Sequence, residues 1–197
     1  MKLLNLDDFG FGISWVLDEA MQRASVALAD GGRVWLVDPV DVPEAIDRAT
    51  ALGEPAAVLQ LLDRHPRDCA KLARRFGVPH LRMPASVPDS PLSAFDIVNI
   101  PRWHEVGLWW PQRRALVVPE TVGTGPFYRH GDTPAGIHLF LRLRPPRSLR
   151  GYTPEHLLVG HGPSIHGPDA ARALRIAYER SLRDLPGTLL RVPFAFR

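Results

Sequence analysis

Cysteine and lysine are both scarce in this sequence. The first scarcity excludes a disulfide within the chain, and the second indicates the base composition of the gene. Cys69 is the single cysteine among 197 residues, so no disulfide can form within the chain. Only Lys2 and Lys71 are lysines, so arginine carries almost all of the positive charge; with 20 prolines, this composition is typical of a GC-rich coding genome. No N-terminal segment has the pattern of a secretion signal, and no apolar run reaches the roughly 18 to 20 residues that a membrane-spanning helix needs. We therefore expect a cytoplasmic protein with no membrane partner.

Sequence motifs of several enzyme classes are also absent. The chain has no Gly-x-Ser-x-Gly nucleophile elbow, no phosphate-binding Walker loop and no dinucleotide-binding glycine fingerprint. A cysteine nucleophile is disfavoured, because Cys69 falls on the apolar face of an expected helix and a nucleophilic thiol needs exposure and a lowered pKa. The net charge is +3 and the arginines are spread along the chain, which argues against nucleic acid as a partner. The densest basic stretch, residues 141–152, leaves a phosphate-binding loop open as an alternative.

The hydrophobic content is 45%, which is enough to build the core of one domain over residues 1–197. Two apolar runs joined by Asp-Gly-Gly predict an antiparallel hairpin over residues 22–40, and a continuous apolar run predicts a buried strand over 56–62. Capping residues at one end and a glycine at the other predict helices over 41–53 and 66–77, with Asp41 as the cap of the first. The first half of the chain therefore alternates strands and helices.

The second half of the chain is richer in strands. Apolar runs bounded by turn residues predict strands over 79–84, 95–100 and 156–162, a hairpin over 106–120, and a final helix over 168–187 with Leu174, Ala177 and Leu182 facing inward. Residues 123–134 have no period and predict a loop, whereas residues 136–143 fit a strand or a helix equally. This order of elements predicts an α/β sandwich with mixed sheets rather than a doubly wound parallel sheet.

Four short motifs carry a resemblance to a known family. Asp38 ends the apolar run VWLVD, residues 61–69 read LLDRHPRDC, residues 115–123 read ALVVPETVG, and residues 157–162 read LLVGHG. In their order and spacing these resemble the metal-binding motifs of the metallo-β-lactamase superfamily. The resemblance implies a four-layer αββα sandwich of the metallo-β-lactamase type with mixed sheets, and an ancestry among metal-dependent hydrolases.

The resemblance also implies that one of the two metal positions of the family has been lost. Two histidines of the first position fall on Arg64 and Pro66, and neither of these side chains can coordinate a cation. The third histidine falls near Pro101, with His104 displaced by three residues along the chain. The cation on Arg64 would replace part of the missing metal charge by pairing with Asp68 or Glu120. On that hypothesis, replacing Arg64 by methionine destabilises the fold.

The second metal position keeps residue types that bind zinc. The resemblance places its ligands at Asp68, Cys69, Glu120 and His161, which offer two carboxylates, a thiolate and an imidazole. Each residue also has an ordinary structural explanation: Asp68 can stabilise a helix start, Cys69 can pack in the core, and Glu120 is one methylene longer than the aspartate of the family. The cofactor is therefore one zinc ion or none. Four further residues are expected to line the same cleft: Asp38, Arg64, His65 and His104.

Two functions remain open at this point. The first is a divergent metallo-β-lactamase-like protein that has lost the dinuclear hydrolase site and keeps the cleft as a surface for a small molecule or a protein partner. The alternative is a mononuclear zinc hydrolase of an ester, thioester, lactone or phosphoester. Four protein ligands would close a tetrahedral zinc site and leave no position for a reactant, so a complete set of ligands favours a structural metal over a catalytic one.

Overall fold

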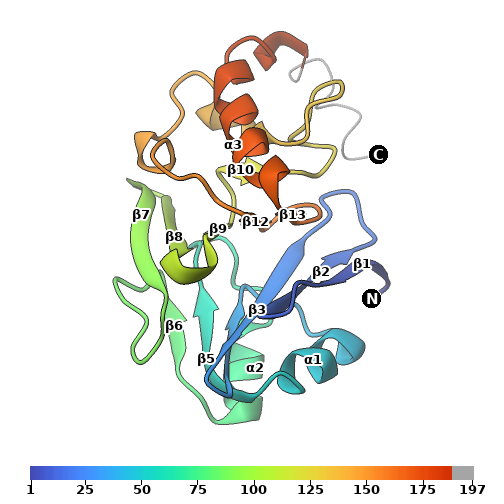
Figure 1. Ribbon diagram of the computed structural model, residues 1–197, viewed down its shortest axis with the longest axis vertical. Helices are drawn as coiled ribbons and strands as arrows, with labels where there is room; N and C mark the ends of the chain where they lie inside the picture. The colour runs from blue at the N-terminus through green and yellow to red at the C-terminus, as the bar shows by residue number, and fades with distance from the viewer. Residues whose placement is uncertain (188–197) are drawn as a thin grey trace.

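Two β-sheets face each other in a computed structural model that describes residues 1–187 (Figure 1). The first sheet has the strand order β1-β2-β3-β4-β5-β6. Its strands are β1 (Leu3–Asp8), β2 (Gly12–Leu17), β3 (Ala24–Asp30), β4 (Arg33–Val37), β5 (Glu54–Gln60) and β6 (His80–Arg82). The second sheet has the order β13-β12-β9-β8-β7. Its strands are β7 (Ser93–Ile100), β8 (Trp103–Trp110), β9 (Ala115–Val118), β12 (His156–Val159) and β13 (Ile165–His166).

Helices cover the outer face of each sheet. The α-helices are α1 (Pro43–Thr50), α2 (Cys69–Phe76) and α3 (Pro168–Arg180). In Figure 1, α3 lies at one end of the molecule and α1 and α2 lie at the other, with the sheets between them. The remaining elements are a two-stranded ribbon of β10 (Val122–Gly123) and β11 (Gly136–Ile137), and the 3-10 helices η1 (Pro111–Arg113), η2 (Leu139–Leu141) and η3 (Arg147–Leu149).

The buried apolar residues form three layers that match this order. The middle layer joins the facing sides of the sheets, for example Leu28 and Leu59 from the first sheet with Leu108 and Val117 from the second. A second layer packs α1 and α2 against the first sheet, and a third packs α3 against the second sheet. The predicted four-layer αββα sandwich with mixed sheets is therefore confirmed. Among the described residues, no helix is both long and apolar enough to cross a membrane.

Local sequence signals explain the first half of the sandwich. Gly31 and Gly32 have positive φ angles of 55° and 78° in the turn of the predicted β3–β4 hairpin. Gly77 ends α2 in the left-handed conformation, as expected for a helix-stopping glycine. The helix α1 differs at its start, because its cap is Val42 rather than Asp41. The Asp41 carboxylate is occupied by salt bridges to Lys71 and Arg75 of α2 instead.

Other parts of the chain differ from the sequence prediction. The hairpin β1–β2 at the N-terminus was not expected, because β1 is an edge strand whose residues are all partly or fully exposed. Residues 136–143 fit a strand and a helix equally because they contain both, the short β11 and the η2 turn. Leu182 is wrong as an inward residue, since 63% of it is exposed and it follows the end of α3.

The topology gathers several strand ends at one edge of the sandwich. Strands β4 and β5 are parallel, so Asp38 and Leu61 emerge side by side, and β9 and β12 are parallel, so Glu120 and His161 follow adjacent strand ends. Isolated bridges join Arg23 to His161 and Leu62 to Glu105, which ties the two sheets together at this edge. Polar side chains that follow these strands therefore meet between the sheets.

Candidate metal centre

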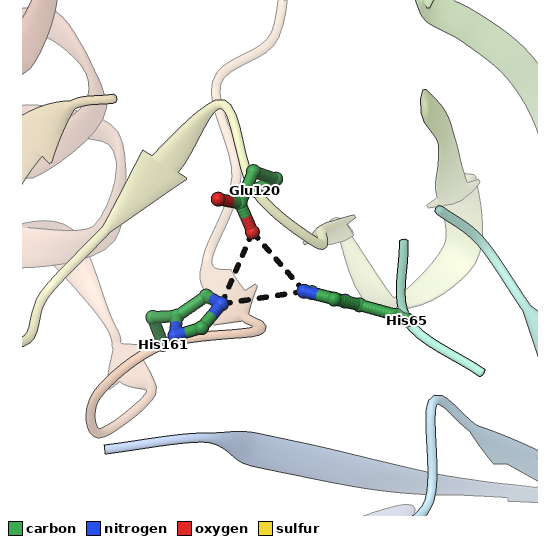
Figure 2. Close-up of side chains that lie close together, drawn as sticks. All are labelled: His65, Glu120 and His161. Carbon is green, nitrogen blue, oxygen red and sulfur yellow. Dashed lines mark hydrogen bonds and ion pairs between the residues drawn. The ribbon is translucent and has the colours of Figure 1, made fainter. Parts of the chain in front are cut away.

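Three side chains converge at this edge: His65, Glu120 and His161 (Figure 2). Glu120 Oε2 lies 3.1 Å from His65 Nε2 and 3.1 Å from His161 Nε2, and the two Nε2 atoms lie 3.3 Å apart. All three residues are buried, with exposed fractions of 5 to 8%. Among the described residues they form the one group of three potential ligands whose atoms all lie within 4.8 Å of one another. This group is hereafter called the His-Glu-His cluster.

Each member of the cluster is placed by the backbone around it. His65 lies in the turn between β5 and α2, where the Leu61 amide donates to Asp38 Oδ1 over 2.9 Å. Glu120 follows β9, and its amide donates to the Glu105 carboxylate over 2.9 Å. His161 follows β12, and its carbonyl accepts from the Thr124 amide over 2.9 Å. The three side chains therefore stand on turns that hydrogen bonds hold in place.

The two glycines around His161 are required by close packing of the backbone. Gly162 has a φ of 92°, and a Cβ atom there would collide with the backbone of Gly125 and with Thr124. A Cβ atom on Gly160 would collide with the carbonyl of Pro119. The Gly-His-Gly motif thus brings the turn after β12 against the turn after β9, which carries Glu120.

Hydrogen-bond partners fix the tautomer of both cluster histidines. His161 Nδ1 lies 3.0 Å from the Met21 carbonyl, and His65 Nδ1 lies 3.2 Å from Asp38 Oδ2. Both partners can only accept a hydrogen bond, so each Nδ1 carries a proton, and a ring that holds a single proton turns an unprotonated Nε2 toward Glu120. Three lone-pair atoms then face one point, which requires a shared cation, either a proton or a metal ion. Histidines that bind metals are held in this way by a carboxylate or carbonyl at the other ring nitrogen.

The protonation states of the cluster also suit a metal ion. Burial alone would raise the pKa of the Glu120 carboxyl, but hydrogen bonds donated by His138, and by His161 or His65 when that ring holds the shared proton, outweigh it and hold the pKa far below its usual range. Burial lowers the pKa of His161, and this effect exceeds the opposing attraction of the Glu120 charge. An ionised carboxylate and a neutral imidazole are the forms that coordinate metals.

The spacing of the cluster fits a small tetrahedral ion. In a tetrahedral zinc site with bonds of about 2.0–2.1 Å, neighbouring ligand atoms lie about 3.3 Å apart. The separations of 3.1, 3.1 and 3.3 Å in the cluster are close to that value. Two imidazoles and one carboxylate are also a donor set found in catalytic zinc sites.

A buried carboxylate and a third histidine, neither of which was predicted from the sequence, support Glu120. Glu105 is fully buried on β8 and accepts hydrogen bonds from the amides of Glu120 and Thr121 and from Trp103 Nε1. Burial raises the pKa of Glu105. His138 lies beyond β11 with its Nε2 3.2 Å from Glu120 Oε1. An acidic residue inside an apolar strand was the signal for Glu105, whereas His138 lies in the stretch whose element type was ambiguous.

Two of the residues expected as ligands lie away from the cluster. Asp68 is the residue before α2, and its Oδ2 accepts from the Asp41 amide over 2.8 Å. Cys69 is fully buried in the layer between α2 and the first sheet, and burial raises the pKa of its thiol far above the usual range. The structure therefore brings Glu120 and His161 together with His65, but not with Asp68 and Cys69.

The residues expected in the cleft are also divided. His65 belongs to the cluster and Asp38 supports it, while His104 lies outside, partly exposed on β8 and 2.9 Å from Asp96. Arg64 stacks over the Trp103 ring at 4.1 Å, and its nearest carboxylate is that of Asp63 at 3.8 Å. The hypothesis that Arg64 pairs with Asp68 or Glu120 is therefore wrong.

A partly buried cation, Arg67, lies near the site. Its guanidinium donates to the carbonyls of Ala24, Asp38 and Gly160, and thereby joins the turns after β4 and β12 to the start of β3. Arg67 was not predicted from the sequence, because one arginine among many gives no signal of its contacts in the fold. Beside this support, a cavity of about 490 Å³ opens onto the cluster, and its wall includes Met21, Arg23, Leu62 and Arg64.

Comparisons with known proteins show the fold. No family model matches the sequence, and no curated protein matches it by sequence. The DIM-1 metallo-β-lactamase exposed to ceftazidime is similar in structure with a TM-score of 0.59 at 12% identity, over 92% of this chain and 98% of that one. FIM-1 from Pseudomonas aeruginosa, in its mono-zinc form, gives 0.54 at 13% over 92% and 97%. The peroxy diiron form of the chemotaxis sensor ODP gives 0.51 at 13% over 89% and 94%. The chain thus has the metallo-β-lactamase fold.

Proposed function

We propose that this chain is a mononuclear metal-dependent hydrolase, with one zinc ion held by His65 Nε2, Glu120 Oε2 and His161 Nε2. The observation that carries the proposal is the convergence of three buried lone-pair atoms, with both histidines held at Nδ1 by groups that only accept. The fold and the mono-zinc form of FIM-1 are consistent with it. The substrate class is an ester, thioester, lactone or phosphoester, as the resemblance implies.

Three ligands favour a catalytic metal over a structural one. Structural zinc sites have four protein ligands, whereas catalytic sites have three and keep one position for a reactant. The four ligands first expected would have closed the site, but Asp68 and Cys69 face elsewhere. The cavity of about 490 Å³ reaches the cluster, so a small molecule has access to the open position.

The chain itself supplies the positioning that such a reaction needs. A zinc ion acts as a Lewis acid, which polarises a carbonyl or phosphoryl oxygen and makes water a better nucleophile. Asp38 and the Met21 carbonyl hold the two imidazole rings in the required orientation. Arg64, half-exposed on the cavity wall, can attract a negatively charged substrate group, and Leu62 adds an apolar wall.

The first test is the metal content of protein purified without a chelator. We expect about one equivalent of zinc in the wild type and in Cys69→Ser, because the Cys69 Sγ contacts the His65 carbonyl at 3.8 Å and is not one of the three converging ligand atoms. We expect less than a tenth of an equivalent in His161→Ala and His65→Ala, with His104→Ala as the matched control that keeps its metal. Zinc that is lost from Cys69→Ser, or retained in both cluster variants, contradicts this site.

The second test asks whether the metal supports turnover. Activity on a panel of nitrophenyl esters, thioesters, lactones and phosphodiesters is expected to disappear with a chelator and to return with zinc. Metal-loaded protein that is inactive on the whole panel would favour the second function, in which the cleft binds a small molecule or a protein without reaction. The observation that favours binding without reaction is Arg64, which lies where the family has a metal ligand and lines the cavity.

A further inference from the structure

The second oxygen of Glu120 has its own partner. Figure 2 shows that Glu120 turns one carboxylate oxygen toward both histidines and the other away from them. The oxygen that is turned away, Oε1, lies 3.2 Å from Nε2 of His138. His138 is not one of the three residues whose ligand atoms converge. Its polar contact with the cluster is the one with Glu120.

The tautomer of His138 is opposite to that of the cluster histidines. His138 precedes η2 and caps it, because its Nδ1 accepts a hydrogen bond from the Phe140 amide over 3.4 Å. A ring nitrogen that accepts from an amide carries no proton, so the proton of the neutral ring is on Nε2. His138 is thus a donor to Glu120, whereas His65 and His161 present lone pairs to it.

The ring of His138 is held rigidly in this orientation. Its backbone amide donates to the Thr121 carbonyl over 2.9 Å, so it is anchored to the turn that carries Glu120. Trp103 packs edge-on against the ring with centroids 5.0 Å apart, and Phe140 and Tyr128 lie at 5.4 and 5.8 Å. Only 7% of His138 is exposed. The ring has little room to turn and offer Nε2 to anything else.

We propose that His138 is a positioning residue that orients the Glu120 carboxylate. It keeps Oε2 turned toward the two histidines and holds Oε1 away from the metal position. This inference rests on the proposed metal centre, where its consequence is that Glu120 binds through one oxygen. A carboxylate that bound through both oxygens would take the position that a substrate needs. The donor on His138 and the amides bound by Glu105 together fix both ends of Glu120.

Two substitutions separate the donor from the ring. His138→Phe keeps an aromatic ring in the cage but removes the N–H group, and His138→Gln keeps an N–H donor on a side chain of similar reach. Loss of a group that orients a ligand lowers metal affinity about 10- to 100-fold. By chelator competition, we expect zinc affinity to fall by this factor in His138→Phe, with one equivalent still bound at saturation, and to recover largely in His138→Gln. Thermal unfolding of each variant checks that it is folded.

Cobalt substitution gives a second readout that packing alone would not change. We expect the visible spectrum of the wild type to indicate four-coordinate cobalt and that of His138→Phe to shift toward a higher coordination number as Glu120 becomes bidentate. Equal loss of affinity in His138→Phe and His138→Gln would assign His138 to packing. Complete loss of zinc from folded His138→Phe would make His138 a ligand. Either result overturns the proposal.

The metal-free protein distinguishes a failure of this inference from a failure of the metal centre. Long-range proton–nitrogen NMR spectra of the histidine rings are expected to place the proton of His138 on Nε2. A proton on Nδ1 of His138 overturns the inference whether or not zinc binds. A wild-type protein that takes up no zinc but has the expected His138 tautomer would refute the metal centre and leave the positioning of Glu120 intact.

Discussion

At the scale of single residues, two neighbouring arginines have opposite roles. Arg67 is partly buried, and its guanidinium donates to the carbonyls of Ala24, Asp38 and Gly160 behind the candidate metal centre. Arg64 is half-exposed and stacks on Trp103, with Asp63 nearby. A buried polar group that loses its charged partner lowers the free energy of unfolding far more than an exposed ion pair raises it. The sequence alone does not separate the two, because both lie in the same turn and have the same side chain.

Replacing each arginine by methionine tests this difference. Arg67→Met removes a charged donor from three carbonyls, of which those of Asp38 and Gly160 keep a second donor, and should lower the free energy of unfolding by about 2 kcal/mol. Arg64→Met is the matched control and should change it by about 0.5 kcal/mol or less, contrary to the expectation from the sequence. Urea unfolding of the two variants at neutral pH measures both values. A larger loss for Arg64→Met than for Arg67→Met would contradict the placement of the two side chains.

At the scale of elements, the sequence predicted the regular parts of the sandwich well. The β3–β4 hairpin, α2 and the β8–β9 hairpin are confirmed, because turn residues and a helix-stopping glycine are local signals that the fold does not override. The edge strand β1 was missed, since its exposed residues have no apolar pattern that would distinguish it from a loop. Local pattern is informative where one face is buried, and it fails at an edge.

The candidate site was harder to predict than the fold. Glu120 and His161 were named as ligands on the resemblance, and the parallel strands β9 and β12 do bring them together. His65 was expected only to line the cleft, because it falls between the two motif positions rather than on one of them. His138 joins the site through a contact between residues 18 positions apart in the chain, which no local pattern encodes. Motif letters identify strand ends, but side-chain direction depends on tertiary packing.

The turn that carries His161 provides a test at the same scale. Gly162 and Gly131 both have positive φ angles, of 92° and 58°, but only Gly162 lies against other backbone. Gly131→Ala should cost about 1 kcal/mol from backbone strain alone and leave zinc binding unchanged. Gly162→Ala should cost at least twice as much and should also reduce zinc content, because it forces the Gly-His-Gly turn away from Glu120. Thermal unfolding and metal analysis of the pair check both outcomes, and equal effects would contradict the packing explanation.

At the scale of the whole molecule, the two sheets are joined at an edge away from the cluster by a chain of polar contacts. Asp7 on β1 lies 2.7 Å from Nε2 of His166 on β13, and Nδ1 of His166 lies 2.7 Å from Nδ1 of His156 on β12. Phe9 and Phe11 pack against these rings. Because a carboxylate only accepts, Nε2 of His166 carries a proton, and the two Nδ1 atoms share one hydrogen. The contact therefore depends on the number of protons that the two histidines hold.

This contact predicts a loss of stability in mild acid. Burial lowers the pKa of His156, and the charges of His166 and Arg113 add to this effect, while Glu155 and Asp7 oppose it. A histidine whose pKa is lower in the folded state takes up its proton more readily when unfolded, so its contribution is complete above the unfolded pKa of about 6.5 and is lost as the pH falls below that value. The free energy of unfolding should therefore decrease between pH 7.5 and pH 5.5.

Replacing His156 by glutamine removes the group that titrates and tests its share of that decrease. His156→Gln should be less stable than the wild type at pH 7.5, because the ring contact with Phe11 is lost, but its stability should fall less between pH 7.5 and pH 5.5. His104→Gln, which replaces a ring on β8 that pairs with Asp96 and takes no part in this contact, should keep the full decrease of the wild type. Urea unfolding at a series of pH values measures the slopes. If the free energy of unfolding of His156→Gln falls with pH as steeply as that of the wild type, the contact between His156 and His166 does not respond to protons. The acid sensitivity then arises elsewhere in the molecule.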